Sequence, residues 1–425
     1  MALVSPAWMR ILMPFSQLTC RNKALDPFIV HCSNYADGAS RRFVDLENIM
    51  RRFDQPLAAA FRKARRTMPA RPAAGRLEPL PAFGDNPGDL LGFAHVPRDL
   101  PRGAPLVVVL HGCTQDAAGY DRGSGWSSLA DEQGFALLYP EQQRGNNPNN
   151  CFNWFRPGDA RRGRGEAESI RQMVAAMVAT HGLDEKRIFV TGLSAGGAMT
   201  SIMLAAYPDV FAGGAVIAGL PFAVANSVPE ALAKMRSAGE IDGAALGALV
   251  ADASPHEGPW PTLSVWHGTA DATVSPDNGA AVVEQWRGLH GAVVGKSETV
   301  DGHRRDVWRD AAGREVIERY TIGGLGHGTP LGTGGDDGNG AAGPHMLEAG
   351  INSTRRIASF WGIVGQPGVI AKVEAAVAGL IPKAPPVRVD VQPFTRRAHR
   401  PAPHPKLAGV AEIIDKALRS AGLLR

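Results

Sequence analysis

Between about residue 90 and residue 361, short apolar segments alternate with longer segments whose apolar positions recur every three or four residues. Segment 105–110 is apolar at every position, which predicts a strand buried on both faces, because a strand with one wet face would alternate with polar residues. Segment 166–181 has its apolar residues at helical spacing, which predicts an amphipathic helix. Those residues are Ile170, Met173, Val174, Met177 and Val178.

The same reasoning covers the rest of this region. Strands are expected at 90–96, 105–110, 134–140, 187–191, 214–218, 262–266 and 316–322, and helices at 126–133, 166–181, 197–206 and 351–361. Alternating strands and helices build a mainly parallel sheet with helices on both faces, so the predicted fold class is α/β. The Ala-rich, mostly helical segment 222–258 interrupts the alternation, and we expect it to cap the functional site.

The regular pattern fades toward both ends of the chain. We expect an irregular, partly disordered N-terminal extension at 1–84, a catalytic domain at 85–365, and a Pro-rich linker with an amphipathic helix at 366–425. Within the last region, 407–424 carries an apolar stripe at i, i+3, i+4 spacing, which is typical of a helix that docks onto another surface. The protein's own body or a second subunit is the expected surface, and a polymer surface is the alternative.

Composition narrows the functional classes. The chain of 425 residues has a net charge of only +4, so no bulk attraction to nucleic acid is predicted. No apolar run approaches the about 18 residues of a transmembrane helix, and the first 20 residues lack the features of a signal peptide. The four cysteines, Cys20, Cys32, Cys113 and Cys151, lack metal-site spacing. The Gly-rich run 334–339 does not match a cation loop, so neither a metal nor a cofactor is expected.

Residues 191–197 read Thr-Gly-Leu-Ser-Ala-Gly-Gly, a G-x-S-x-G motif centred on Ser194. A strand is expected immediately before this motif and a helix immediately after it, which is the context of a nucleophile elbow. Gly192 and Gly196 have no Cβ, so the strained turn can form. The motif therefore predicts Ser194 as a nucleophile at the carboxyl edge of the sheet in an α/β-hydrolase fold.

A serine hydroxyl is a weak nucleophile at neutral pH and needs a base that an acid orients. In α/β-hydrolases the acid follows the serine in the chain, and the histidine follows the acid. Asp271 lies just after the strand expected at 262–266, so it is the predicted acid. Asp277, slightly downstream, is the alternative.

The histidine should lie on the loop after the strand expected at 316–322. His327 stands there between glycines, which allow the loop to bend toward the serine, and it is the predicted base. His345 is the alternative. His267, next to the acid-bearing loop, is expected to make structural hydrogen bonds.

Acyl transfer also needs N–H donors where an oxyanion develops. One comes from the residue after the nucleophile, Ala195, and the other from the loop after an early strand. That loop reads His-Gly-Cys-Thr-Gln at 111–115, and the Cys113 amide is the predicted second donor. No base for the Cys113 thiol is evident in the sequence, so we do not predict it to be a nucleophile.

With these residues assigned, about residues 85–365 resemble the polyhydroxybutyrate depolymerase family of esterases, which also contains feruloyl and acetylxylan esterases. The similar motifs are Leu-His-Gly-Cys-Thr-Gln at 110–115, Cys-Phe-Asn-Trp-Phe at 151–155, Gly-Leu-Ser-Ala-Gly-Gly at 192–197, Trp-His-Gly at 266–268 with Asp271 and Val274, and Gly-His-Gly at 326–328. Five motifs in this order are specific for the family and much less specific for the substrate.

The resemblance implies the α/β-hydrolase fold and the triad of Ser194, Asp271 and His327. It also suggests that Cys113 and Cys151 are bridged. It implies that Trp154 lines the acyl- or polymer-binding face, although a core aromatic is the alternative for this residue. An extracellular or periplasmic location is implied as well. A cytoplasmic one is the alternative, because the signal peptide and appended binding module of many secreted members are not recognised here.

The predicted function is hydrolysis of carboxylic esters through a serine acyl-enzyme, with polyhydroxyalkanoate or short-chain esters as substrates. A feruloyl or acetylxylan-type esterase acting on plant polysaccharide esters is the alternative. Less favoured alternatives are a peptidase or acyltransferase that uses the same triad, and a non-catalytic binding protein that keeps the fold.

Overall fold

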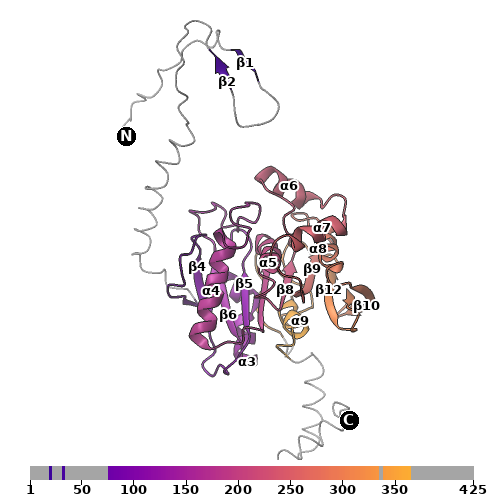
Figure 1. Ribbon diagram of the computed structural model, residues 1–425. Coiled ribbons are helices and arrows are strands. Elements are labelled where there is room, and N and C mark those ends of the chain that lie inside the picture. Colours follow the sequence, from indigo (N-terminus) through magenta and orange to yellow (C-terminus); the bar gives the residue numbers. More distant parts are fainter. Residues whose placement is uncertain (1–18, 22–30, 34–74, 335–337, 365–425) are drawn as a thin grey trace, which may run out of the picture. The chain divides into compact units, whose positions relative to one another are not determined.

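The computed structural model describes residues 19–21, 31–33, 75–334 and 338–364 (Figure 1). The expected Pro-rich linker and C-terminal helix at 366–425 lie outside the described residues, as does most of the expected N-terminal extension. Two short strands are described from that extension, β1 (Thr19–Arg21) and β2 (His31–Ser33). They pair antiparallel, with Cys20 opposite Cys32.

Ten strands form one sheet in the order β10-β11-β12-β9-β8-β7-β5-β6-β4-β3. Its six central strands, from β12 to β6, run parallel. Antiparallel strands extend it at both ends. The bounds are β3 Glu78–Pro79, β4 Leu91–His95, β5 Leu106–Leu110, β6 Ala136–Glu141, β7 Ile188–Leu193, β8 Gly213–Ile217, β9 Thr262–Gly268, β10 Val293–Val300, β11 His303–Arg309 and β12 Glu315–Ile322.

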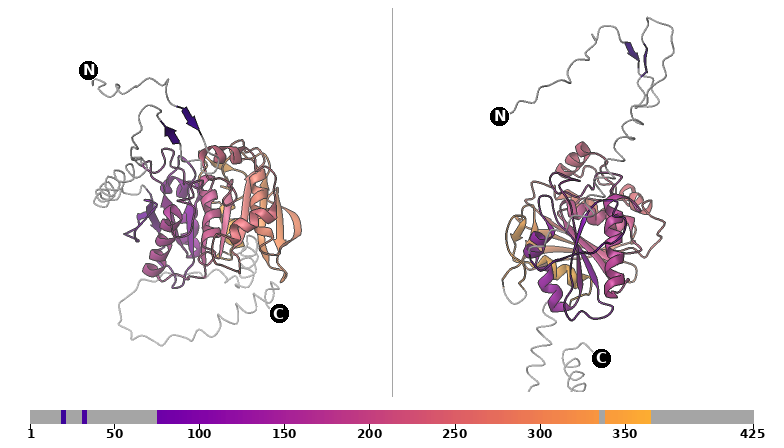
Figure 2. Two further views of the ribbon diagram at one scale, coloured as in Figure 1. Left: turned by 45° about the horizontal axis from the view of Figure 1, so that its top comes forward. Right: turned by 90° about the vertical axis from the view of Figure 1, so that its left-hand side faces the viewer.

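Helices cover both faces of this sheet (Figure 2). One face carries α4, α5 and α8, and the other carries α2, α3 and α9. A short two-stranded sheet of β13 and β14 also forms. The remaining bounds are α2 Ala117–Ser124, α3 Trp126–Gln133, α4 Gly165–His181, α5 Ala195–Ala206, α6 Val228–Arg236, α7 Gly243–Ala251, α8 Asp277–Arg287, β13 Thr329–Leu331, β14 Met346–Glu348 and α9 Ser353–Phe360.

The side chains of β5 explain why the central strands are apolar throughout. Leu106, Val108 and Leu110 pack into the core on one face of the sheet. Val107 and Val109 pack into the core on the other face. Because side chains alternate across a strand, a sheet covered on both sides requires apolar residues at every position. The predicted α/β class, with a mainly parallel sheet and helices on both faces, is confirmed.

The sequence pattern did not predict the hairpin of β10 and β11, which extends one end of the sheet. Its charges are matched across strands: Arg305 on β11 donates to Glu298 on β10 at 2.8 Å and to Glu318 on β12 at 2.7 Å. Glu318 is buried and also accepts from Ser264 Oγ on β9. Cross-strand ion pairs therefore compensate the charged side chains of this hairpin, whose charge content does not resemble that of a core strand.

The two outer strands of the sheet are both irregular. At one end, β3 has two residues and includes Pro79. At the other end, the register of β10 shifts between Val294 and Lys296, and Val293 and Val294 are exposed.

The parallel strands bring several loops to one edge of the sheet, because parallel strands all end on the same side. Ser194 follows β7, Asp271 lies on the loop after β9, and His327 lies on the loop after β12. The loop that begins at His111 follows β5 at the same edge. The insert with α6 and α7 follows β8 and contacts the Asp271 loop, where Ser275 N–H donates to Met235 O at 2.7 Å.

Candidate active site

Ser194 lies in a strained turn between β7 and α5. Its φ of 57° and ψ of −115° fall where side-chain-bearing residues are rare, as expected for a nucleophile elbow. A Cβ on Gly192 would lie 2.5 Å from backbone atoms of Gly196, and one on Gly196 would lie 2.6 Å from His111 O. Both positions thus require glycine. The Ser194 hydroxyl caps no helix N–H, so it is not committed to a structural hydrogen bond there.

Asp271 and His327 are hydrogen-bonded to each other, with His327 Nδ1 2.8 Å from Asp271 Oδ2. The other carboxylate oxygen, Oδ1, accepts the backbone N–H groups of Thr273 and Val274 at 2.9 Å each. Burial opposes ionisation of Asp271, but the hydrogen bonds from two histidines and a backbone N–H outweigh it. They hold the pKa of this carboxyl well below its usual range.

Two hydrogen bonds join the loops that carry these two residues. Ala270 N–H donates to Leu325 O at 2.9 Å, and Gly324 N–H donates to Thr269 Oγ1 at 2.8 Å. The acid loop and the histidine loop therefore form one unit, which holds the Asp271–His327 pair at the sheet edge that also carries Ser194.

The alternative residues lie elsewhere in this arrangement. Asp277 starts α8 and is in its first turn. His345 is exposed and donates from Nδ1 to His327 O at 3.0 Å, so it contacts the backbone of the predicted base and not the acid. His267 is buried, with Nε2 3.0 Å from Val274 O and 3.3 Å from Asp271 Oδ2, and thus supports the acid loop.

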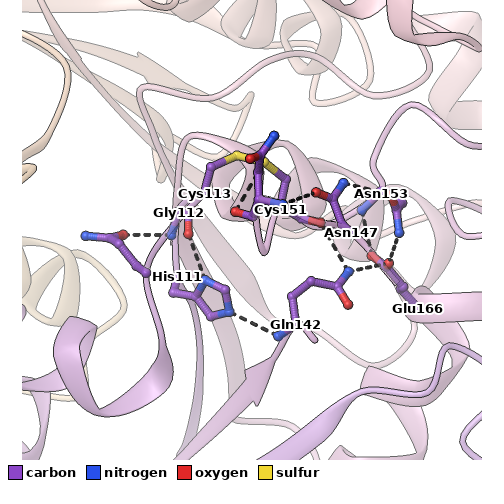
Figure 3. The surroundings of a disulfide bond; sticks show 10 residues. His111, Gly112, Cys113, Gln142, Asn147, Cys151, Asn153 and Glu166 are labelled. Carbon is purple, nitrogen blue, oxygen red and sulfur yellow. Dashed lines mark hydrogen bonds between the residues drawn. A yellow bond between two sulfur atoms is a disulfide. The ribbon is translucent and has the colours of Figure 1, made fainter. Parts of the chain in front are cut away.

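The loop after β5 presents the predicted second oxyanion donor. Within the described residues, the N–H groups of Cys113 and Ala195 donate to no acceptor. A disulfide joins Cys113 to Cys151, and Thr114 N–H donates to Asn149 O at 2.7 Å. These links attach the loop to the segment 142–153 (Figure 3).

A buried polar cluster that the sequence did not predict lies beneath this loop (Figure 3). His111, Gln142 and Glu166 are each at most 2% exposed. Burial lowers the pKa of His111 to about 4 and raises the pKa of Glu166 to about 8. Of the three, only His111 had a usable signal in the sequence, because it precedes the Gly-Cys pair; Gln142 and Glu166 resemble ordinary loop and helix residues.

Trp154 is 8% exposed and packs edge-to-face on Phe155 with ring centroids 5.6 Å apart. It belongs to the same core cluster as α4 and α5, so most of the indole is part of the core.

Across the described ranges 19–21, 31–33, 75–334 and 338–364, no group of three or more His, Cys, Asp or Glu side chains is arranged to hold a metal ion. In those ranges, no helix is both long and apolar enough to cross a bilayer.

Comparison with known proteins agrees with the observed fold. Residues 96–308 match the family model of the esterase PHB depolymerases. The chain belongs to this family. Membership of the esterase PHB depolymerase family confirms the predicted resemblance, the α/β-hydrolase fold and the class of carboxylic ester hydrolase.

The relatives of this PHB depolymerase family member are named for different substrates. The chain is 49% identical over 288 residues to poly(3-hydroxyalkanoate) depolymerase C of Paucimonas lemoignei, over 67% of this chain and 69% of that protein. It is 31% identical over 266 residues to acetylxylan esterase A of Aspergillus oryzae, over 60% and 85% of the two chains. It is 32% identical over 259 residues to feruloyl esterase B of Talaromyces funiculosus, over 58% and 72%.

Among solved structures, the acetyl xylan esterase from Aspergillus awamori superposes with a TM-score of 0.58 at 23% identity. The match covers 68% of this chain and 100% of that one. At this identity the likeness shows a shared fold.

Proposed function

We propose that this protein hydrolyses esters of hydroxyalkanoic acids through a covalent acyl-enzyme on Ser194, with His327 as base and Asp271 as the orienting acid. The observation that carries the proposal is the hydrogen-bonded Asp271–His327 pair, held at the same sheet edge as a serine in a strained elbow. A serine with an oriented histidine base is the arrangement that activates the nucleophile for ester hydrolysis through an acyl-enzyme.

In the acylation step, Ser194 Oγ attacks the ester carbonyl carbon and its proton passes to His327 Nε2. In the neutral imidazole, a proton on Nδ1 that is donated to Asp271 Oδ2 leaves Nε2 as the ring nitrogen that can accept a proton. The ionised Asp271 then stabilises the imidazolium. When the tetrahedral intermediate collapses, the bond to the alkoxy oxygen breaks, and His327 returns the proton to the departing alcohol.

The negative charge that develops on the carbonyl oxygen is assigned to the N–H groups of Cys113 and Ala195. Support comes from their having no other acceptor in the described part of the chain, and from the position of Ala195 at the start of α5. In the second half of the reaction, His327 removes a proton from water, which attacks the acyl carbon. Collapse of the second tetrahedral intermediate releases the acid and restores Ser194.

The substrate class rests on relatedness. Identity to the poly(3-hydroxyalkanoate) depolymerase is 49%, against 31% and 32% for the acetylxylan and feruloyl esterases. We also propose that segment 407–424, outside the described residues, anchors the enzyme to polymer through its apolar stripe. If so, a chain lacking 380–425 should sediment less with polymer granules while keeping its turnover of soluble esters. Unchanged sedimentation would contradict the anchoring role.

A location in an oxidising compartment is proposed from the Cys113–Cys151 disulfide, because such bonds persist where glutathione does not reduce them. Alkylation of the active, unreduced enzyme followed by peptide mass spectrometry is expected to leave both thiols unlabelled. Labelling of both cysteines in fully active enzyme would contradict the proposal.

The decisive experiment measures hydrolysis of p-nitrophenyl butyrate, amorphous poly(3-hydroxybutyrate), acetylated xylan and methyl ferulate by the wild type and by Ser194→Ala. We expect turnover of the butyrate ester and clearing of the polyester, with both abolished in the variant. Preference for acetylated xylan or methyl ferulate would replace the proposed substrate class. Equal turnover by Ser194→Ala would overturn the mechanism.

A further inference from the structure

One peptide unit of the loop after β5 is held from its carbonyl side. Gly112 O accepts the Nδ1–H of His111 at 2.8 Å and the N–H of Gln115 at 3.3 Å. A peptide unit is planar, and its C=O and N–H groups point in opposite directions. The hydrogen bonds to Gly112 O therefore also set the direction of the Cys113 N–H, the donor that we assign to the oxyanion.

The His111 ring is in turn fixed by Gln142. The backbone N–H of Gln142, the residue after β6, donates to His111 Nε2 at 3.1 Å. That nitrogen must accept, so the single proton of the neutral ring is on Nδ1, facing Gly112 O. Burial lowers the pKa of His111 to about 4, so the ring stays neutral and keeps this tautomer at neutral pH.

Gln142 is anchored by Glu166, from the first turn of α4 (Figure 3). Glu166 Oε1 accepts from Gln142 Nε2 at 2.5 Å and from Asn153 Nδ2 at 2.6 Å, and Oε2 accepts from Asn153 N–H at 2.8 Å. Gln142 Nε2 also donates to Cys151 O at 3.1 Å. Three donors thus converge on one carboxyl group that is 1% exposed.

Burying a carboxyl group is costly even when it is hydrogen-bonded, and apolar residues of similar size often stabilise a core equally well. The two sets of contacts made by Glu166 lead to the same place. Through Gln142 and His111, the first set reaches the carbonyl of Gly112. The second set holds Asn153, two residues after Cys151, and Cys151 is covalently joined to Cys113. Both routes end on the peptide unit that carries the oxyanion donor.

We propose that Glu166 is a positioning residue for ester hydrolysis, which acts through Gln142 and His111 to aim the Cys113 N–H at the oxyanion. This inference rests on the proposed function, specifically on Cys113 as a donor. Glu166 itself touches neither substrate nor Ser194. Its effect should therefore appear in the stability of the transition state and leave substrate binding almost unchanged.

The test compares Glu166→Ala and Glu166→Gln with the matched control Glu168→Gln. Glu168 lies two residues further along α4, and its hydrogen bonds go to Arg171, Gln172 and Tyr207, away from the oxyanion loop. For each variant, kcat and KM are measured with p-nitrophenyl butyrate. The inhibition constant of an alkyl trifluoromethyl ketone, which adds to the serine as a tetrahedral oxyanion, is measured alongside.

Loss of one oxyanion donor typically costs roughly 10²–10³ in kcat, so misdirecting one is expected to lower kcat by about 10- to 100-fold in Glu166→Ala. KM should stay within about threefold, and the ketone should bind more weakly by the same factor as kcat falls. Glu166→Gln should be intermediate, because one oxygen can still accept from Gln142 while its amide group faces a donor of Asn153. Glu168→Gln should keep kcat within about twofold.

Full kcat in a folded Glu166→Ala variant would overturn the proposal, as would a fall in kcat with unchanged affinity for the ketone. If Glu166→Ala does not fold, Glu166→Gln and Gln142→Leu supply the same comparison. Failure of all three variants to fold would assign Glu166 a purely structural role. Failure of the proposed function itself would be recognised separately, because Ser194→Ala would then retain turnover.

Discussion

Replacing Asp271 with Asn would separate two tasks that the two oxygens of this carboxylate perform. Oδ1 accepts the N–H groups of Thr273 and Val274, and an amide oxygen can do the same, so the loop should keep its shape. Oδ2 accepts Nδ1–H of His327, and an amide nitrogen in its place is a donor. His327 must then accept at Nδ1 and carry its proton on Nε2, the atom that we propose receives the proton of Ser194.

The expected loss is large. In the Ser-His-Asp template the wrong histidine tautomer lowers kcat roughly 10⁴-fold, which is about 5.4 kcal/mol of transition-state stabilisation at about 1.36 kcal/mol per tenfold change. The Asp271 side chain is 0% exposed, so solvent screens its charge little as the imidazolium forms. KM should change by less than about threefold, because a fully buried carboxylate is not placed to contact the substrate in the ground state.

The assay is kcat and KM for p-nitrophenyl butyrate, together with the thermal unfolding midpoint of Asp271→Asn. Asp277→Asn is the control: Asp277 is in the first turn of α8, and its loss is expected to cost at most about 1 kcal/mol of stability and no activity. A folded Asp271→Asn variant with more than about a tenth of the wild-type kcat would refute this reasoning. A loss confined to Asp277→Asn would transfer the role to that residue.

Three further outcomes are expected. Gly196→Ala would bring a Cβ to 2.6 Å from His111 O, so the elbow should shift and turnover fall at least about 100-fold; wild-type turnover at an unchanged unfolding temperature would contradict this. His345→Ala removes one hydrogen bond to a backbone carbonyl and should lower kcat less than about fivefold in the same assay, whereas a loss matching that of Asp271→Asn would identify His345 as the base. Burial lowers the pKa of His111 from 6.5 to about 4, so between these pH values the unfolded chain binds a proton that the folded protein excludes. The free energy of unfolding should therefore fall as the pH drops from 6.5 to 4, and urea unfolding at several pH values should show a shallower fall in His111→Gln.

The fold was predictable where local pattern and burial agree. Strand β5 is apolar on both faces because helices cover both faces, and the elbow is encoded within seven consecutive residues, 191–197. The strand β11 was not predictable, because its Arg305 is stabilised by carboxylates from two neighbouring strands that no local window contains.

The candidate site shows the same division. Asp271 and His327 could be expected from chain order and from their positions after strands, since parallel strands end at one edge. Gln142 and Glu166 could not be predicted as members of the site, because they are hydrogen-bonded to each other across 24 residues of sequence and no local pattern indicates that contact. Likewise, no periodicity indicates that Trp154 is largely buried.

The two irregular outer strands of the large sheet have a consequence for the protein in crowded conditions. An outer strand with a long regular row of unpaired N–H and C=O groups can recruit a strand from another molecule and start aggregation. Here one outer strand, β3, is two residues long and includes Pro79, and the other, β10, is interrupted by a register shift next to Lys296. Neither outer strand therefore offers a long, regular edge on which a second molecule could pair a strand when the protein is concentrated.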